Sequence, residues 1–273
     1  MGEGAGNTST TGIRDTGLGR FALYADTTGR SNSAVGFSAL VSNTTGSYNS
    51  AIGHTALLEN TTGYKNSAIG YAALRNNTTG HHNVAFGYFA GSNQDTGHDN
   101  IYLVNTGVAG ESGQIKIGTA GTHTKTTIAG IRGTAVPGGI TVLVDSNGVL
   151  GTTVSSARFK QDVRDMGDSS DVLMKLRPVT FRYREDVVGK EDAKTPQYGL
   201  IAEEVEEVAP ELVAPDLDGK PYSVKYQELP ALLLNELQKE ERVIEKEEQL
   251  IAALSARLEA DEGASGATCQ EWR

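Results

Sequence analysis

The sequence predicts a mainly β protein with a C-terminal α+β unit. We expect trimeric β-solenoid or β-roll repeats and a β-stem, followed by a small α+β domain that ends in a long coiled-coil helix. Glycine and threonine recur every 17 residues in the first part of the chain. Residues 1–154 hold 27 of the 33 glycines with 8 basic and 8 acidic side chains, whereas residues 155–273 hold 16 basic and 26 acidic ones. Near the end, apolar residues alternate between spacings of three and four, as in a coiled coil.

The composition also excludes several classes of partner. All ten net negative charges lie after residue 154, and no basic cluster could neutralise the phosphates of nucleic acid or of an anionic membrane. The single cysteine, Cys269, excludes an internal disulfide. No apolar run has the length of a transmembrane segment, and the first residues lack the order of a signal peptide. We expect no nucleic-acid or membrane partner, and the residues alone leave the localisation unknown.

The first element is the 17-residue repeat, over residues 15–103, after a segment at 1–14 that we expect to be disordered. Each repeat closes on a Thr-Gly pair. Four further positions keep their chemistry from repeat to repeat: Asn32, Asn49, Asn66, Asn83 and Asn100; Val35, Ile52, Ile69 and Phe86; Gly36, Gly53, Gly70 and Gly87; and Leu23, Leu40, Leu57 and Leu74.

So short a repeat cannot bury an apolar face alone, so the repeats must stack as a solenoid. Stacked asparagines can then hydrogen bond from one turn to the next. The apolar stripe of each coil is thin, so we expect other copies of the chain to cover it. The predicted partner is therefore the chain itself, in a homotrimer.

The repeats carry a family resemblance. The segments N-S-A-V-G at 32–36 and N-S-A-I-G at 49–53 and 66–70 resemble the head repeats of trimeric bacterial adhesins and of phage tail fibres. Those repeats build trimeric β-rolls, so the resemblance implies a fibre-like or adhesin-like architecture. A cell-surface receptor or a glycan is the kind of partner that such a fibre contacts.

Residues 104–154 are expected to form the β-stem. The 17-residue period stops, and strand-like segments such as 115–117 and 141–144 replace it. The second of these precedes Asp145-Ser146-Asn147-Gly148, a hairpin turn. Glycines divide this region into short strands, which would find more partners across a trimer than within one chain.

Residues 155–227 indicate a small α+β unit. Apolar residues between 166 and 176 have helical spacing. Strand-like segments at 179–183 and 222–226 flank a short amphipathic helix at 202–208.

Residues 228–260 are predicted to form one long coiled-coil helix, and residues 261–273 a disordered tail. Two positions of the seam, Glu240 and Glu247, are polar. A solitary helix of this amphipathicity is marginal in water, so self-association is expected. Its apolar seam consists of Leu233, Leu237, Ile244, Ile251, Leu254 and Leu258.

Four segments in this second part resemble, in their order, the intramolecular chaperone auto-processing domain at the C-terminus of phage endosialidase tailspikes and tail-fibre-like proteins. They span residues 155–160, 176–183, 199–205 and 222–226. The resemblance implies a domain that assembles the trimer in front of it and then cuts itself off as a serine peptidase. The roles of nucleophile and base fall on Ser155 and Lys160, and the cleaved bond is Val154–Ser155. The residue after the serine, often aspartate in that family, is Ser156 here.

The residues by themselves allow the same pairing. All five histidines precede residue 155 and Cys269 lies in the tail, so the second part has no Ser-His or Cys-His pair. A serine with a lysine remains, and the lysine needs a pKa lowered by desolvation or by a cation such as Arg158. Without the resemblance, Ser155 and Ser156 are most simply capping or turn residues.

Other candidate sites have simpler explanations. His81 and His98 share one column and could hold a metal on a threefold axis, but an exposed turn histidine is the default, so we predict no metal and no cofactor. A glycosidase needs two converging carboxylates, and the acids of the repeat region are isolated. One further column is interpreted as an aromatic ladder rather than as a glycan platform: Phe37, His54, Tyr71 and Tyr88.

These inferences lead to one function and one alternative. We predict a trimeric fibre or spike whose C-terminal domain assists trimer assembly and then releases itself at Val154–Ser155. As an enzyme it would act once, on its own chain, with no external substrate. The alternative is a structural or adhesive fibre that keeps the domain as a trimerisation foot. The resemblance implies a virion tail or a bacterial surface as the location.

Overall fold

The structure, a computed structural model, describes residues 4–5, 11–216 and 218–270, with side chains described to residue 259. It divides into two compact units, Met1–Thr134 and Ala135–Arg273. Within the described part of the chain, no helix has both the length and the hydropathy needed to cross a bilayer. Most of the segment at 1–14, predicted to be disordered, lies outside the described residues.

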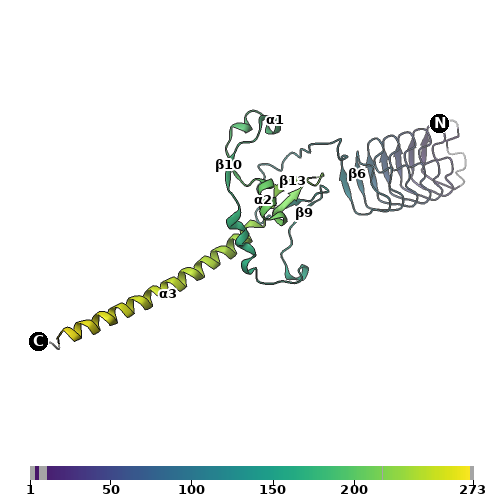
Figure 1. The fold of residues 1–273 in the computed structure, drawn as a ribbon. Helices are drawn as coiled ribbons and strands as arrows, with labels where there is room; N and C mark the ends of the chain where they lie inside the picture. Colours follow the sequence, from purple (N-terminus) through teal and green to yellow (C-terminus); the bar gives the residue numbers. More distant parts are fainter. Residues whose placement is uncertain (1–3, 6–10, 217, 271–273) are drawn as a thin grey trace. The chain divides into compact units, whose positions relative to one another are not determined.

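The first unit is a β-solenoid, as the sequence predicts (Figure 1). Each coil contributes one short strand to a seven-stranded parallel sheet whose order follows the sequence. Ala34 pairs with Ala51, and Ala51 with Ala68, so the sheet register equals the 17-residue period. The strands are β1 (Thr16–Leu18), β2 (Ser33–Val35), β3 (Ser50–Ile52), β4 (Ser67–Ile69), β5 (Val84–Phe86), β6 (Ile101–Leu103) and β7 (Ile115–Ile117).

The last coil is shorter than the others. β7 pairs in parallel with β6, with Ile101 opposite Ile115, a spacing of 14 residues. The sheet therefore continues past residue 103, where the sequence period stops. A search for a 17-residue period could not detect this coil, because it lacks three residues.

The solenoid core consists of small columns. In β2–β5 the central residue points inward and is buried, as is the leucine of the turn that follows each of β1–β4: Ala34, Ala51, Ala68 and Ala85; and Leu23, Leu40, Leu57 and Leu74. Tyr102 ends the alanine column and is fully buried. Gly91 takes the place of leucine beside it, because a Cβ there would lie 2.7 Å from the Tyr102 ring.

Two ladders of buried asparagines run along the solenoid, which confirms the predicted bonding between turns. In the first ladder, the main-chain N–H of Asn49 donates to Oδ1 of Asn32 at 3.0 Å. In the second ladder, Nδ2 of Asn60 donates to Oδ1 of Asn43 at 2.8 Å. Both ladders meet at one carbonyl, because Asn49 Nδ2 and Asn60 Nδ2 both donate to the oxygen of Gly63, at 2.8 and 3.0 Å. The buried amides are thus paired, as buried polar groups require.

The turn glycine of each coil is required by this arrangement. A Cβ on Gly63 would lie 2.5 Å from the carbonyl oxygen of Gly80 and 2.2 Å from Oδ1 of Asn60. The first atom belongs to the main chain, and the second is held by a hydrogen bond from Nδ2 of Asn77. Neither can move away, so no side chain fits at Gly63. This explains why a Thr-Gly pair closes each repeat.

The second unit contains short elements and one long helix. Its strands form three two-stranded antiparallel sheets. In chain order the elements are β8 (Val142–Val144), β9 (Leu150–Thr152), η1 (Ala157–Phe159), η2 (Gly167–Lys175), β10 (Val179–Phe181), α1 (Glu185–Val188), η3 (Asp192–Lys194), β11 (Gln197–Gly199), α2 (Ala202–Val208), η4 (Pro210–Leu212), β12 (Val213–Pro215), β13 (Pro221–Val224) and α3 (Leu229–Gln270).

Several of these elements follow the sequence prediction and others differ. α2 has the predicted bounds, whereas η2 is a 3-10 helix rather than an α-helix. Its first half, Gly-Asp-Ser-Ser, consists of poor helix formers. The long helix α3 is present (Figure 1). Its backbone continues into the segment predicted as a tail, 261–273, whose side chains lie outside the described residues.

The core of the second unit is small. Val205 of α2, Leu212 of η4 and Val224 of β13 are among its five buried apolar residues. Val172, Leu176, Leu200 and the first turn of α3 pack against them, partly buried. This core therefore ties η2, α2, β13 and the beginning of α3 together.

Candidate functional site

The predicted cleavage segment lies between two short elements of the second unit. Ser155 follows β9, and Lys160 follows the single turn of η1. The turn is closed by two main-chain hydrogen bonds, from Phe159 N to Ser156 O at 3.0 Å and from Lys160 N to Ala157 O at 3.1 Å. Both flanking residues of η1 are extended, with ψ of 136° at Ser156 and 146° at Lys160.

The single chain leaves this segment open to solvent. Ser155, Lys160 and the intervening residues are all exposed, and Val154 is 57% exposed. Among the described residues, no hydrogen bond joins the side chains of Ser155 and Lys160. Arg158, the predicted neighbouring cation, lies over the ring of Phe159 at 4.8 Å. One chain therefore supplies both candidate residues but does not bring them together.

The hairpin before the segment has a well-defined turn. β8 and β9 pair antiparallel, with Val142 opposite Thr152. Oδ1 of Asp145 accepts the main-chain N–H groups of Val149 at 2.8 Å and Asn147 at 2.9 Å. These bonds hold the pKa of Asp145 below its usual value. The predicted turn at 145–148 thus leads directly into the strand that precedes Val154.

A polar cluster that the sequence analysis missed joins η2 to α3. Nδ2 of Asn235 donates to the carbonyl of Gly167 at 2.8 Å and also to the hydroxyl of Ser170, which is buried. That hydroxyl in turn donates to Glu236. Lys239 pairs with Glu236 at 2.9 Å and lowers its pKa together with Ser170. No sequence signal connects these residues, because Ser170 and Asn235 are 65 positions apart.

An apolar groove lies beside this cluster. It has a volume of about 660 Å³ and is lined by Leu173, Val179, Tyr198 and Leu233 among others. Tyr198 is 82% exposed. Leu233 is also the first residue of the predicted helical seam, so groove and seam are continuous. All six apolar residues of that seam are more than half exposed: Leu233, Leu237, Ile244, Ile251, Leu254 and Leu258.

The outer face of the solenoid sheet is uncharged. The first and last residues of each strand flank the inward-facing central residue, and across β1–β7 none of these flanking residues is charged. Several are large, apolar and open to solvent: Leu18, Ile52, Ile69, Val84, Phe86, Ile115 and Ile117. A continuous apolar row of this kind is unusual on an isolated chain, because such patches generally mark interaction surfaces.

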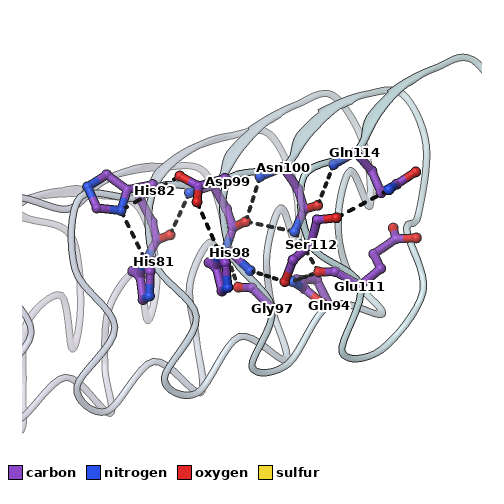
Figure 2. A network of polar contacts seen from close by, with 12 residues as sticks. His81, His82, Gln94, Gly97, His98, Asp99, Asn100, Glu111, Ser112 and Gln114 are labelled. Carbon is purple, nitrogen blue, oxygen red and sulfur yellow. Dashed lines mark hydrogen bonds and ion pairs between the residues drawn. The ribbon is translucent and has the colours of Figure 1, made fainter. Parts of the chain in front are cut away.

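Three of the five histidines, His81, His82 and His98, lie close together near the last coils of the solenoid (Figure 2). The rings of His81 and His98 stack at 4.9 Å, and Nδ1 of His98 lies 2.9 Å from Oδ2 of Asp99. Burial, together with His98 and His82, holds the pKa of His81 below its usual value. In the part of the chain that the structure describes, no three His, Cys, Asp or Glu side chains gather so as to hold a metal. We therefore assign this cluster no site.

The aromatic column predicted from the repeat is a stacked ladder. Ring centroids lie 5.1 Å apart between Phe37 and His54, 5.2 Å between His54 and Tyr71, and 5.3 Å between Tyr71 and Tyr88. Because neighbouring rings cover each other's faces, the ladder presents mainly ring edges. A sugar ring would need an open aromatic face.

Comparison with known proteins found one similar family, for a segment of the second unit. No curated protein matches the sequence. Residues 155–214 match the family model described as the chaperone of endosialidase, whose name denotes a peptidase family. The match begins at Ser155, the residue predicted to follow the cut, and includes Lys160. Residues 155–214, which run from two residues before η1 into β12, are therefore similar to the chaperone of endosialidase family.

Proposed function

We propose that this chain is part of a trimeric fibre or spike, whose C-terminal domain assists trimer assembly and then releases itself at the Val154–Ser155 bond. One observation carries the proposal: the family match begins at Ser155, within an exposed segment between β9 and η1. The released domain would thus coincide with the family domain at its first residue.

The surfaces of the single chain support assembly with copies of itself. The uncharged outer row of the solenoid sheet is apolar from Leu18 to Ile117. Between Thr119 and Lys160 every residue except Leu143 is exposed, so this stretch has no core of its own. Identical chains would present the same rows in the same register, and three such rows can cover one another. The seam of α3 offers a third surface of the same kind.

The cut itself needs a serine nucleophile and a base. In the proposed reaction, Lys160 in its neutral form takes the proton from Oγ of Ser155, and Oγ attacks the carbonyl carbon of Val154. The C–N bond breaks, and the proton passes to the leaving nitrogen of Ser155. An ester between Val154 and Oγ remains. Water hydrolyses it to a carboxylate on Val154 and a free hydroxyl on Ser155.

The exposure of both residues indicates when the cut would occur. A lysine becomes an effective base when desolvation favours its neutral form. In one chain Lys160 and Ser155 are open to water, so we infer that neighbouring chains cover them during assembly. Cleavage would then follow trimer formation and mark its completion.

Mass spectrometry of the purified protein tests the proposal. The wild type should separate into fragments of 154 and 119 residues, the second beginning at Ser155. Ser155→Ala and Lys160→Ala should each keep the chain whole and still trimerise. Lys160→Arg should also fail to cut, because a guanidinium does not give up its proton.

Ser156→Ala is the matched control, since it removes the neighbouring hydroxyl and should leave cleavage intact. Whole wild-type chains in well-formed trimers would refute self-release and favour the alternative, a fibre that keeps the domain as a foot. Cleavage that persists in Ser155→Ala would refute the assignment of the nucleophile.

A further inference from the structure

The coil that contains β1 departs from the pattern of the asparagine ladders. Its two ladder positions carry aspartates, Asp15 and Asp26, where the following coils carry asparagine. Asp26 is fully buried, and Oδ2 of each aspartate is buried without a hydrogen-bond partner. An unpaired buried carboxylate oxygen is costly, so this pair needs an explanation.

The neighbouring coils show where these oxygens lie. Nδ2 of Asn32 and Nδ2 of Asn43 both donate to the carbonyl oxygen of Gly46, at 2.9 and 3.0 Å. The corresponding amide nitrogens of the next two coils donate in the same way to the carbonyl oxygens of Gly63 and Gly80. Each coil thus brings two amide nitrogens to one glycine carbonyl, at intervals of 14 and 3 residues.

The aspartates adopt the same orientation as the asparagines that follow them. Oδ1 of Asp15 accepts the N–H of Asn32 at 2.8 Å, as Oδ1 of Asn32 does for Asn49. Oδ1 of Asp26 accepts the N–H of Gly29 at 2.9 Å and also faces Nδ2 of Asn43. In both side chains Oδ2 therefore occupies the position of Nδ2 in the other coils.

The result is a convergence of acceptors. The same intervals, 14 residues from Asp15 and 3 from Asp26, lead to the carbonyl of Gly29. Where the other coils have two donors and one acceptor, this coil has three oxygens and no donor among the described residues. Each aspartate begins one ladder with its Oδ1, but the two buried Oδ2 atoms and the carbonyl oxygen would repel one another unless a positive charge lies between them.

We propose that Asp15, Asp26 and the Gly29 carbonyl form a binding site for a hard divalent cation of the calcium type. Ca²⁺ prefers carboxylate and main-chain carbonyl oxygens and tolerates irregular geometry, with water completing its shell. Mg²⁺ demands a near-ideal octahedron and gives up water reluctantly, so it should bind more weakly. The cation would replace the two missing donors and fasten this coil to the next.

Calorimetric titration of the full chain with Ca²⁺, after removal of metal by a chelator, tests the site. The wild type should bind about one Ca²⁺ per chain, with its thermal unfolding midpoint raised by Ca²⁺ and lowered again by chelator. The double variant Asp15→Asn/Asp26→Asn should bind none and unfold at the same temperature with and without Ca²⁺. It should fold, because it restores the amides that the following coils already use.

Two further variants sharpen the test. Glu59→Gln removes an exposed acid of the repeat region and should leave Ca²⁺ binding unchanged. Asn32→Asp/Asn43→Asp, added to the double variant, should recreate the site one coil later, around the Gly46 carbonyl. Binding that survives in Asp15→Asn/Asp26→Asn would refute the assignment. A wild type that binds no Ca²⁺ and loses stability as pH rises would show that the aspartates hold protons instead.

Discussion

The two units of this chain differ in how much of their stability lies within one copy. The solenoid has a continuous core of 14 buried residues, supported by two hydrogen-bonded ladders. The core of the second unit has five buried apolar residues, while α3 exposes its whole apolar seam. A repeated coil finds its partners in the coils before and after it. The second unit has no such repeated neighbours, and the apolar seam of α3 stays exposed in one chain.

This difference suggests that the two units contribute differently to assembly. The solenoid pairs the amides of its asparagine ladders within one chain, but its similar coils offer many nearly equivalent alignments between chains. The second unit has a non-repeating surface, so in the proposed trimer its copies would meet in only one register. We therefore expect assembly to begin in the second unit and to be transmitted to the repeats.

The largest expected effect is that of separating the two units. A chain truncated after Val154 should aggregate or misassemble, because the exposed apolar row from Leu18 to Ile117 would find partners slowly and without alignment. A chain of residues 155–273 should form trimers on its own. Light scattering and ultracentrifugation measure both. Normal trimers from the truncated chain would show that the second unit is no assembly device.

The next effect concerns the backbone of the solenoid. Gly63→Ala would place a Cβ 2.5 Å from the Gly80 carbonyl oxygen, so we expect a loss of more than about 4 kcal/mol in the free energy of unfolding. Gly151→Ala in β9, where a Cβ meets no atom within 4 Å, is the matched control and should change stability by less than about 0.5 kcal/mol. Thermal and denaturant unfolding, followed by circular dichroism, measures both. Equal losses would contradict the contrast between the two units.

The smallest effect lies in the polar cluster between η2 and α3. Asn235→Ala removes the donor to the Gly167 carbonyl and to the Ser170 hydroxyl, and should cost about 1–2 kcal/mol. Hydrogen exchange should show earlier opening of η2, while the repeats keep their protection. Asn93→Ala, in an exposed turn of the solenoid, is the control with a smaller expected loss. An unchanged exchange pattern in η2 would show that the apolar contacts alone hold it to α3.

Much of the fold was predictable because the period of the sequence is also the register of the sheet. Asn49 bonds to Asn32 because one turn of the solenoid separates them, and the repeat shows the same separation. α2 was predicted because apolar and acidic residues alternate at helical spacing. β7 was predicted as a strand of the stem and not as a further coil of the solenoid, since its coil is three residues shorter. η2 has the apolar spacing on which the helix prediction rested, but it is a 3-10 helix because the residues of its first half are weak helix formers.

The candidate cleavage site was predicted from the sequence through the family resemblance, whose first segment, residues 155–160, contains both Ser155 and Lys160. Ser155 and Lys160 flank a single turn, and the family match covers both. Their proposed meeting depends on copies of the chain, so neither the sequence nor one folded chain displays it. Intact mass with Ser155→Ala and Ser156→Ala is the experiment that decides it.

By itself the sequence determined the solenoid, its first asparagine column and the family resemblance of residues 155–214, because in each case the informative residues repeat at a constant interval or stand close together in the chain. Only the tertiary structure decided that Oδ1 of Asp26 accepts the N–H of Gly29 while its Oδ2 is buried without a partner, and that Asn235 reaches Ser170. Those contacts join residues at unrelated intervals, and the path of the backbone alone brings them together. Contacts between residues one repeat apart can be predicted from the sequence. Contacts between residues at other separations can be found only in the folded chain.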